Sequence, residues 1–265
     1  MTWIEALILG IIQGLTEFLP VSSSGHLEMG TVLLGVKSEE NLLFAVIVHA
    51  ATALSTIVVF RKDIGEIITG LFQFKWNESW DFGIKIIISM IPVGIVGVFF
   101  EDEITALFTG NLLLVGSMLL VTSALLFFSH FKKNNEKPVS KPHALIIGLA
   151  QAVAILPGIS RSGATIATAL LLGVEKNKAT RFSFLMVLIP ILGASMLKLK
   201  DYFEAPAAYE GLSGPSMVVG FLAAFLAGYV ACKWMIGIVR KGKLTYFAAY
   251  CLVIGLIAII SQIWI

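Results

Sequence analysis

Charged side chains are scarce in this chain of 265 residues: they make up 14% of it, against roughly 25% in ordinary soluble domains. Apolar residues account for 57%, and the mean hydropathy is +0.91. This composition excludes disordered and fibrous proteins, and a formal net charge of only +2 argues against a nucleic-acid partner. A water-soluble enzyme of this size could not bury so much apolar surface. The sequence therefore predicts an all-α protein that crosses a membrane several times.

Cysteine is also nearly absent. Cys232 and Cys251 both lie inside apolar runs, which predicts buried core residues and no disulfide framework. The N-terminal apolar segment has no basic region before it and contains Glu5, so we expect no cleavable signal peptide.

Six segments are long and apolar enough to cross a bilayer, which takes about 20 residues. They cover residues 41–60, 84–100, 112–131, 180–199, 216–236 and 244–264. Two further apolar regions, 2–35 and 143–173, are interrupted near the middle by Pro, Gly and Ser. Irregular backbone at membrane depth is tolerated only beside protein or a wet cavity. We therefore predict two re-entrant helical hairpins whose tips reach a cavity. Two ordinary spans joined by an outer loop are the alternative for each region.

The two interrupted regions resemble each other, and their similarity predicts an inverted repeat. Gly10, Gln13, Pro20, Ser22, Ser24 and Gly25 parallel Gly148, Gln151, Pro157, Ser160, Ser162 and Gly163. A hairpin returns the chain to its starting side and three spans change sides, so the second set must be inverted. We predict one integral membrane domain over 1–265, with a first repeat over 1–131 and a second, inverted repeat over 143–265.

Basic residues gather in the loops on one side of this topology, which makes that side cytoplasmic. It holds Arg61, Lys62, Lys75, Lys85, Lys132, Lys133, Lys137, Lys141, Lys176, Lys178, Arg181, Lys233, Arg240, Lys241 and Lys243. The opposite side holds Lys37, Lys198 and Lys200. Both termini are then expected outside the cell. The first hairpin enters from outside, and the second enters from the cytoplasm.

Ionisable side chains inside apolar segments are functional candidates, because burying them in a bilayer is costly. Gln13 and Glu17 share a helix face, His26 follows three serines, and Arg161 stands between two serines. If the hairpin tips meet, these groups converge at two helix N-termini, which favour anions. Such a set fits phosphoryl recognition or transfer on a lipid with an anionic head. The alternative is a purely structural role: hydrogen bonds within the fold for Glu17 and His26, and helix caps for the serines.

Three more ionisable residues lie in the apolar segments. His49 is in the middle of a span, where we expect it to pack beside the first tip and support it. Glu5 and Glu28 lie toward the outer ends of their half-helices, where we expect them to be solvated.

Two long motifs occur in the interrupted regions: GLTEFLPVSSSGHL from Gly14 to Leu27, and LPGISRSGATI from Leu156 to Ile166. With them the whole chain resembles the undecaprenyl-diphosphate phosphatase family linked to bacitracin resistance. The resemblance implies a plasma-membrane phosphatase that removes the terminal phosphate of a polyprenyl diphosphate at the outer face. The product, undecaprenyl phosphate, is the lipid carrier that is recycled for cell-wall synthesis.

The family's motifs imply a site on Glu17, Ser22, Ser23, His26 and Arg161. We predict that Ser23 is the nucleophile and that His26 takes its proton or activates the second-step water. Glu17 would orient His26 or ligate a cation, and Arg161 would bind the phosphates. His26 as the nucleophile is the alternative. The substrate-binding residues that we expect are Gln13, Ser22, Ser24, Ser160, Ser162, Gly163 and Thr165.

The resemblance also implies help from a divalent cation, Mg²⁺ or Ca²⁺, held by Glu17. Gln13 stands at a motif position where other members can carry Glu, and an amide cannot supply a second carboxylate. A polyprenyl-phosphate transporter or flippase is the alternative function, because inverted repeats with broken helices suit alternating access. Such a carrier would use the same anion site without a nucleophile. We leave a homodimer open as the assembly.

Overall fold

The computed structural model describes residues 1–36, 38–108, 110–132, 136–204 and 214–262, and within them the regular structure is helical throughout. The helices are α1 (Trp3–Phe18), α2 (Ser23–Leu34), α3 (Ser38–Val59), α4 (Arg61–Leu71), α5 (Glu78–Phe99), α6 (Glu101–Thr105), α7 (Leu112–His130), α8 (Lys141–Val153), α9 (Arg161–Leu171), α10 (Lys176–Met186), α11 (Leu188–Glu204), α12 (Gly214–Arg240) and α13 (Thr245–Ser261). The all-α prediction is confirmed. Lys37, Lys133 and the last residues of the predicted span 244–264 lie outside the described ranges.

Several helices are suited to crossing a membrane. Within the described residues, α5, α7, α12 and the stretch Lys176–Leu197 are each long and apolar enough. Phe44–Val59 of α3 and α4 meet the same criterion as a pair, but they are bent by 77° at their junction. The apolar α13 is shorter, at 17 residues. The chain thus has the helices of a multi-pass membrane protein.

Each interrupted region folds into two short helices joined by a turn. Pro20 lies in the turn after α1, and Ser22 caps α2 by accepting a hydrogen bond from the Gly25 N–H at 3.2 Å. In the other region Ser160 caps α9 in the same way, accepting from the Gly163 N–H at 3.0 Å. The Pro and Ser of each motif therefore end one helix and begin the next.

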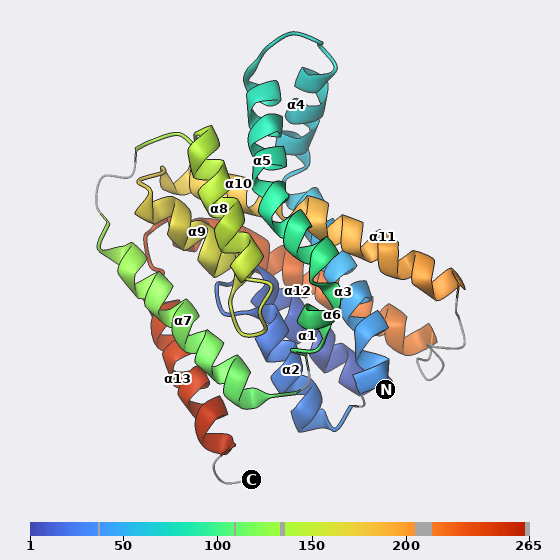
Figure 1. Cartoon of the computed structure of the whole chain (residues 1–265). Coiled ribbons are helices and arrows are strands. Elements are labelled where there is room, and N and C mark those ends of the chain that lie inside the picture. Colours follow the sequence, from blue (N-terminus) through green and yellow to red (C-terminus); the bar gives the residue numbers. More distant parts are fainter. Residues whose placement is uncertain (37, 109, 133–135, 205–213, 263–265) are drawn as a thin grey trace.

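Each of these helix pairs packs against a helix from the other half of the chain. α1 lies along α12 and α8 lies along α5, while α7 and α13 run side by side (Figure 1). The approach is close because glycine has no side chain. A Cβ on Gly10 of α1 would lie 2.5 Å from the carbonyl oxygen of Gly220, and one on Gly148 of α8 would lie 2.4 Å from that of Ser89. These contacts bring the two interrupted regions together in the middle of the molecule.

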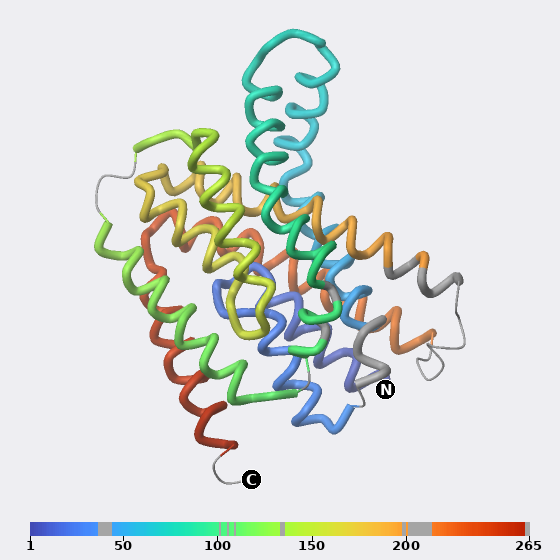
Figure 2. The backbone as a smooth tube through the Cα atoms, in the orientation of Figure 1, coloured from blue at the N-terminus to red at the C-terminus, as the bar shows by residue number. Residues whose placement is uncertain are grey.

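One predicted boundary was wrong, and one predicted span contains a break. Residues 61–83 were expected as a polar loop, but they contain α4, which packs against the start of α5 and forms with it an arm that extends beyond the other helices (Figure 2). The predicted span 180–199 overlaps the stretch Lys176–Leu197, which is long and apolar enough for a crossing, and a break at Val187 divides it into α10 and α11. Pro190 explains this division, because it has no N–H to bond the carbonyl of Met186.

Candidate active site

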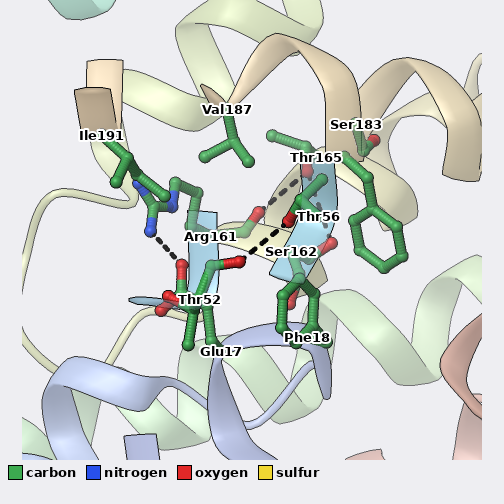
Figure 3. Close-up of a pocket in the computed structure, with 11 residues that line it drawn as sticks. Glu17, Phe18, Thr52, Thr56, Arg161, Ser162, Thr165, Ser183, Val187 and Ile191 are labelled. Carbon is green, nitrogen blue, oxygen red and sulfur yellow. Dashed lines mark hydrogen bonds and ion pairs between the residues drawn. The ribbon is translucent and has the colours of Figure 1, made fainter. Parts of the chain in front are cut away.

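The two turns are joined by an ion pair between Glu17, on the last turn of α1, and Arg161, the first residue of α9 (Figure 3). The Glu17 side chain is only 5% exposed, and that of Arg161 is 27% exposed. The guanidinium contacts Oε1 of the carboxylate. Removing one partner of such a pair leaves an uncompensated charge in a poorly solvated place, so each residue depends on the other.

The second oxygen of Glu17 has three neighbours. Oε2 accepts hydrogen bonds from Nε2 of Gln13 at 2.9 Å and from Oγ of Ser23 at 2.6 Å. Nε2 of His49 lies 3.6 Å from the same oxygen, so His49 does stand beside the first turn, as expected. The carboxylate therefore orients the hydroxyl that the sequence predicts as the nucleophile.

His26 has different partners. Its Nδ1 lies 2.8 Å from the backbone carbonyl oxygen of Ser22, and its Nε2 lies 2.8 Å from the hydroxyl of Tyr250 in α13. The expected pairings of His26 with Ser23 and with Glu17 are therefore not formed. Ser23, the first residue of α2, donates its hydroxyl to Glu17 in α1, while the imidazole of His26 is taken up by Tyr250 in α13.

The serines predicted to bind substrate lie at the start of α2 and α9. At the first turn, Oγ of Ser22 accepts the capping hydrogen bond and lies 3.3 Å from Oγ of Ser24. This hydroxyl pair and the N-terminal N–H groups of α2 form one side of the candidate site. Ser22 adopts a left-handed backbone conformation, with φ at 71°, which is uncommon for a residue with a side chain.

The second turn repeats this arrangement. Oγ of Ser160 lies 3.3 Å from Oγ of Ser162, and Ser162 donates to the carbonyl of Leu19 at 3.2 Å. Gly163 donates its N–H to Ser160, and Thr165 donates its hydroxyl to the Arg161 carbonyl at 2.9 Å. The Ser162 bond is a direct contact between the two turns. All the predicted binding residues therefore lie at or next to the junction.

A small cavity with both polar and apolar lining lies against the ion pair (Figure 3). Its volume of about 20 Å³ suits a single water-sized group and not a diphosphate. It is lined by Glu17, Phe18, Thr52, Thr56, Arg161, Ser162, Thr165, Ser183, Phe184, Val187 and Ile191. Sequence reasoning missed Thr52, Thr56 and Ser183. The sequence signal that could have identified Thr52 and Thr56 is their spacing of four residues within an apolar span.

The two glutamates expected in solvent have structural partners. Glu5 accepts a hydrogen bond from the N–H of Thr2 at 2.8 Å and closes a capping box at the start of α1. Glu28 is partly buried and accepts a hydrogen bond from the N–H of Gly110, so the prediction of a solvated residue was wrong for it. Gly110, in the connection before α7, thus contacts α2 at Glu28.

The donor set for a cation is small. Within the described residues no three His, Cys, Asp or Glu side chains are grouped as metal ligands. Glu17 provides the carboxylate, and Oε1 of Gln13 is a buried oxygen without a hydrogen-bond partner. One carboxylate and one amide oxygen fit a hard cation such as Mg²⁺, which binds oxygen ligands and usually shares its coordination with substrate phosphates.

Comparison with known sequences adds independent information. A family profile described as "Bacitracin resistance protein BacA" matches residues 6–257. A protein of Christiangramia forsetii named undecaprenyl-diphosphatase is 57% identical over 258 residues, which cover 97% of each chain. A protein of the same name from Bacteroides thetaiotaomicron is 55% identical over 99% of this chain and 100% of its own length. A third, from Halothermothrix orenii, is 42% identical over 97% and 96%.

Proposed function

The chain belongs to the bacitracin resistance protein BacA family, and we propose that it hydrolyses undecaprenyl diphosphate to undecaprenyl phosphate and phosphate. Three relatives that align over nearly their full length carry the name of that activity. One observation supports the assignment of the active-site residues: Ser23 and Arg161 contact the same buried carboxylate, Glu17. A hydroxyl, a guanidinium fork and two helix N-termini are what a phosphoryl-transfer site requires.

We propose six spans and two re-entrant hairpins for the membrane topology. The lengths of α1, α2, α8 and α9 support this proposal, because each has 16 residues or fewer and is short for a full crossing. The packing of α1 on α12 and of α8 on α5 supports two interlocked, inverted halves. In this arrangement the site opens to the outside, and both termini lie outside.

In the proposed first step the hydroxyl of Ser23 attacks the terminal phosphorus. A bond forms between Oγ and phosphorus, the bond from phosphorus to the bridging oxygen breaks, and undecaprenyl phosphate leaves. The proton passes to Glu17, whose Oε2 is 2.6 Å from Oγ. Arg161 binds the nonbridging oxygens and so leaves Glu17, which makes the carboxylate a stronger proton acceptor.

In the second step water hydrolyses the phosphoserine. His26 takes a proton from the water as its oxygen bonds to phosphorus, and the bond from phosphorus to Oγ breaks. Ser23 recovers its proton from Glu17, inorganic phosphate leaves, and His26 then releases its proton to solvent.

A divalent cation fits this site as a partner of the substrate. Oε1 of Glu17, the oxygen that Arg161 leaves, and Oε1 of Gln13 would hold it, and when bound it would neutralise charge on the diphosphate. We expect an excess of chelator to reduce phosphate release from the purified protein, and added Mg²⁺ or Ca²⁺ to restore it. Full activity after exhaustive chelation would contradict the proposal of a cation.

Phosphate release by the protein purified in detergent tests the function. With undecaprenyl or farnesyl diphosphate as substrate, we expect turnover that is lost in Glu17→Ala and His26→Ala. Ser117→Ala, on an exposed face of α7, is the matched control and should keep wild-type turnover. Tight lipid binding without phosphate release would contradict a phosphatase and indicate a carrier instead.

A further inference from the structure

Tyr250 is a partner of His26 that the sequence analysis did not predict. Its hydroxyl lies 2.8 Å from Nε2 of the imidazole. The two rings are also stacked, with centroids 5.6 Å apart and planes at 13° to each other. One polar contact and one ring contact, between residues 224 positions apart, fix both the position and the rotation of the imidazole.

The hydrogen bonds of His26 identify which ring nitrogen carries the proton. Nδ1 faces the carbonyl oxygen of Ser22, which can only accept, so Nδ1 must be the donor. In the neutral ring the single lone pair of Nε2 then accepts the hydrogen bond of the Tyr250 hydroxyl. Nε2 is thus the basic nitrogen, and it can take a proton from water once the water has replaced the hydroxyl at this lone pair.

α13 also holds the turn that carries His26. Sγ of Cys251 lies 3.6 Å from the carbonyl oxygen of Pro20 and is fully buried there. Two consecutive residues of α13 therefore contact this region: Tyr250 contacts α2 at His26, and Cys251 contacts the turn before it, in which Ser22 has its left-handed conformation. Such a conformation persists only when its surroundings hold it in place. Tyr250 itself is 42% exposed, so this contact lies at the surface of the fold and not in its core.

We infer that Tyr250 is a positioning residue for the hydrolysis: its ring and hydroxyl hold His26 with Nε2 unprotonated, and the attacking water takes the place of the hydroxyl at Nε2 to give up its proton. The inference rests on the proposed phosphatase function. The ring contact fixes where the imidazole lies, the Ser22 carbonyl fixes which nitrogen carries the proton, and the hydroxyl keeps the other nitrogen unprotonated until water replaces it.

The kinetic test separates the hydroxyl from the ring. Tyr250→Phe keeps the ring and removes the donor, and we expect kcat to fall roughly five- to tenfold while KM changes less than about twofold. Tyr250→Leu removes both contacts and should lower kcat about a hundredfold. Tyr246→Phe, on the same helix with its ring 68% exposed and beside Lys243, is the control and should leave kcat unchanged. An unchanged or raised kcat in Tyr250→Phe, or an effect on KM alone, would overturn the inference.

A spectroscopic test does not depend on activity. In the wild-type protein labelled with ¹⁵N-histidine, we expect His26, assigned by its loss in His26→Gln, to show a protonated Nδ1 and an unprotonated Nε2. The Nε2 signal should move in Tyr250→Phe and stay in place in Tyr246→Phe. A wild-type spectrum with Nε2 protonated would refute the inference, whatever the kinetics. The expected spectrum in a protein that releases no phosphate would instead contradict the proposed function and leave the positioning of His26 supported.

Discussion

Glu17 is the residue on which the candidate site depends. Its carboxylate accepts hydrogen bonds from the Arg161 guanidinium, the Ser23 hydroxyl and the Gln13 amide, and the His49 ring lies beside it. A carboxylate with so many donors keeps each of them in one orientation. A single acidic side chain therefore positions the groups that would attack and bind the phosphate.

The first prediction concerns the nucleophile. Replacing Ser23 by Ala should lower kcat at least about a thousandfold, because the attacking oxygen is removed. KM should change little, because the groups that bind the phosphates remain. Steady-state phosphate release measures the effect, with Ser117→Ala as the control. Near-normal turnover in Ser23→Ala would remove this residue from the role and assign the attack to His26.

The second prediction concerns the guanidinium group of Arg161. Arg161→Lys keeps the charge but loses the planar fork, and one ammonium cannot hold two phosphate oxygens as a guanidinium does. We expect kcat/KM to fall about a hundredfold or more. Arg240→Lys is the matched control, because Arg240 lies at the end of α12, bonds Asn177 and is outside the site. A loss of less than about threefold in Arg161→Lys would show that charge alone suffices.

At the scale of the elements, the site depends on two close helix contacts. Gly10 lets α1 lie against α12, and Gly148 lets α8 lie against α5. Glycine in a helix normally costs about 1 kcal/mol relative to Ala, but here a methyl group would meet a backbone carbonyl. These contacts set the distance between helices and so the place where the two turns meet.

The third prediction tests the contact at Gly148. Gly148→Ala should destabilise the protein by about 1–3 kcal/mol, because the new Cβ would lie 2.4 Å from the Ser89 carbonyl oxygen and α8 would have to move. Gly94→Ala is the control: Gly94 lies in α5 with no atom within 4 Å of its added Cβ, so the change should be neutral or slightly stabilising. The apparent Tm in detergent measures both. Equal Tm values for the two variants would contradict the tight contact.

Much of this arrangement could be predicted from the sequence, because the Pro, Gly and Ser interruptions are local signals. The pairing of Glu17 with Arg161 followed from the assumption that two such interruptions meet. Tyr250 could not be found in this way, since an aromatic residue in an apolar span carries no pattern that distinguishes it. The contact of Ser23 with Glu17 and not with His26 depends on the rotation of α2 about its axis, which hydrophobic patterning does not fix.

At the scale of the whole molecule, the proposed topology has one clear experimental consequence. Lys75 lies at the end of the arm, on the side predicted to be cytoplasmic, and the exposed Glu103 lies in α6 on the opposite side. A cysteine at position 103 should react with a membrane-impermeant maleimide in intact cells. A cysteine at position 75 should react only after the membrane is permeabilised. The native Cys232 and Cys251 are fully buried, so they contribute little background. The reverse pattern would invert the topology and place the site on the cytoplasmic face.

The contact of α1 with α12 also bears on how the protein is made. α1 leaves the ribosome long before α12 and before Arg161, the counter-ion of Glu17. Until then an acidic half-helix has neither its neighbour nor its charge partner. The contacts that the structure shows for α1 and for Glu17 can therefore form only after the second half of the chain has been synthesised.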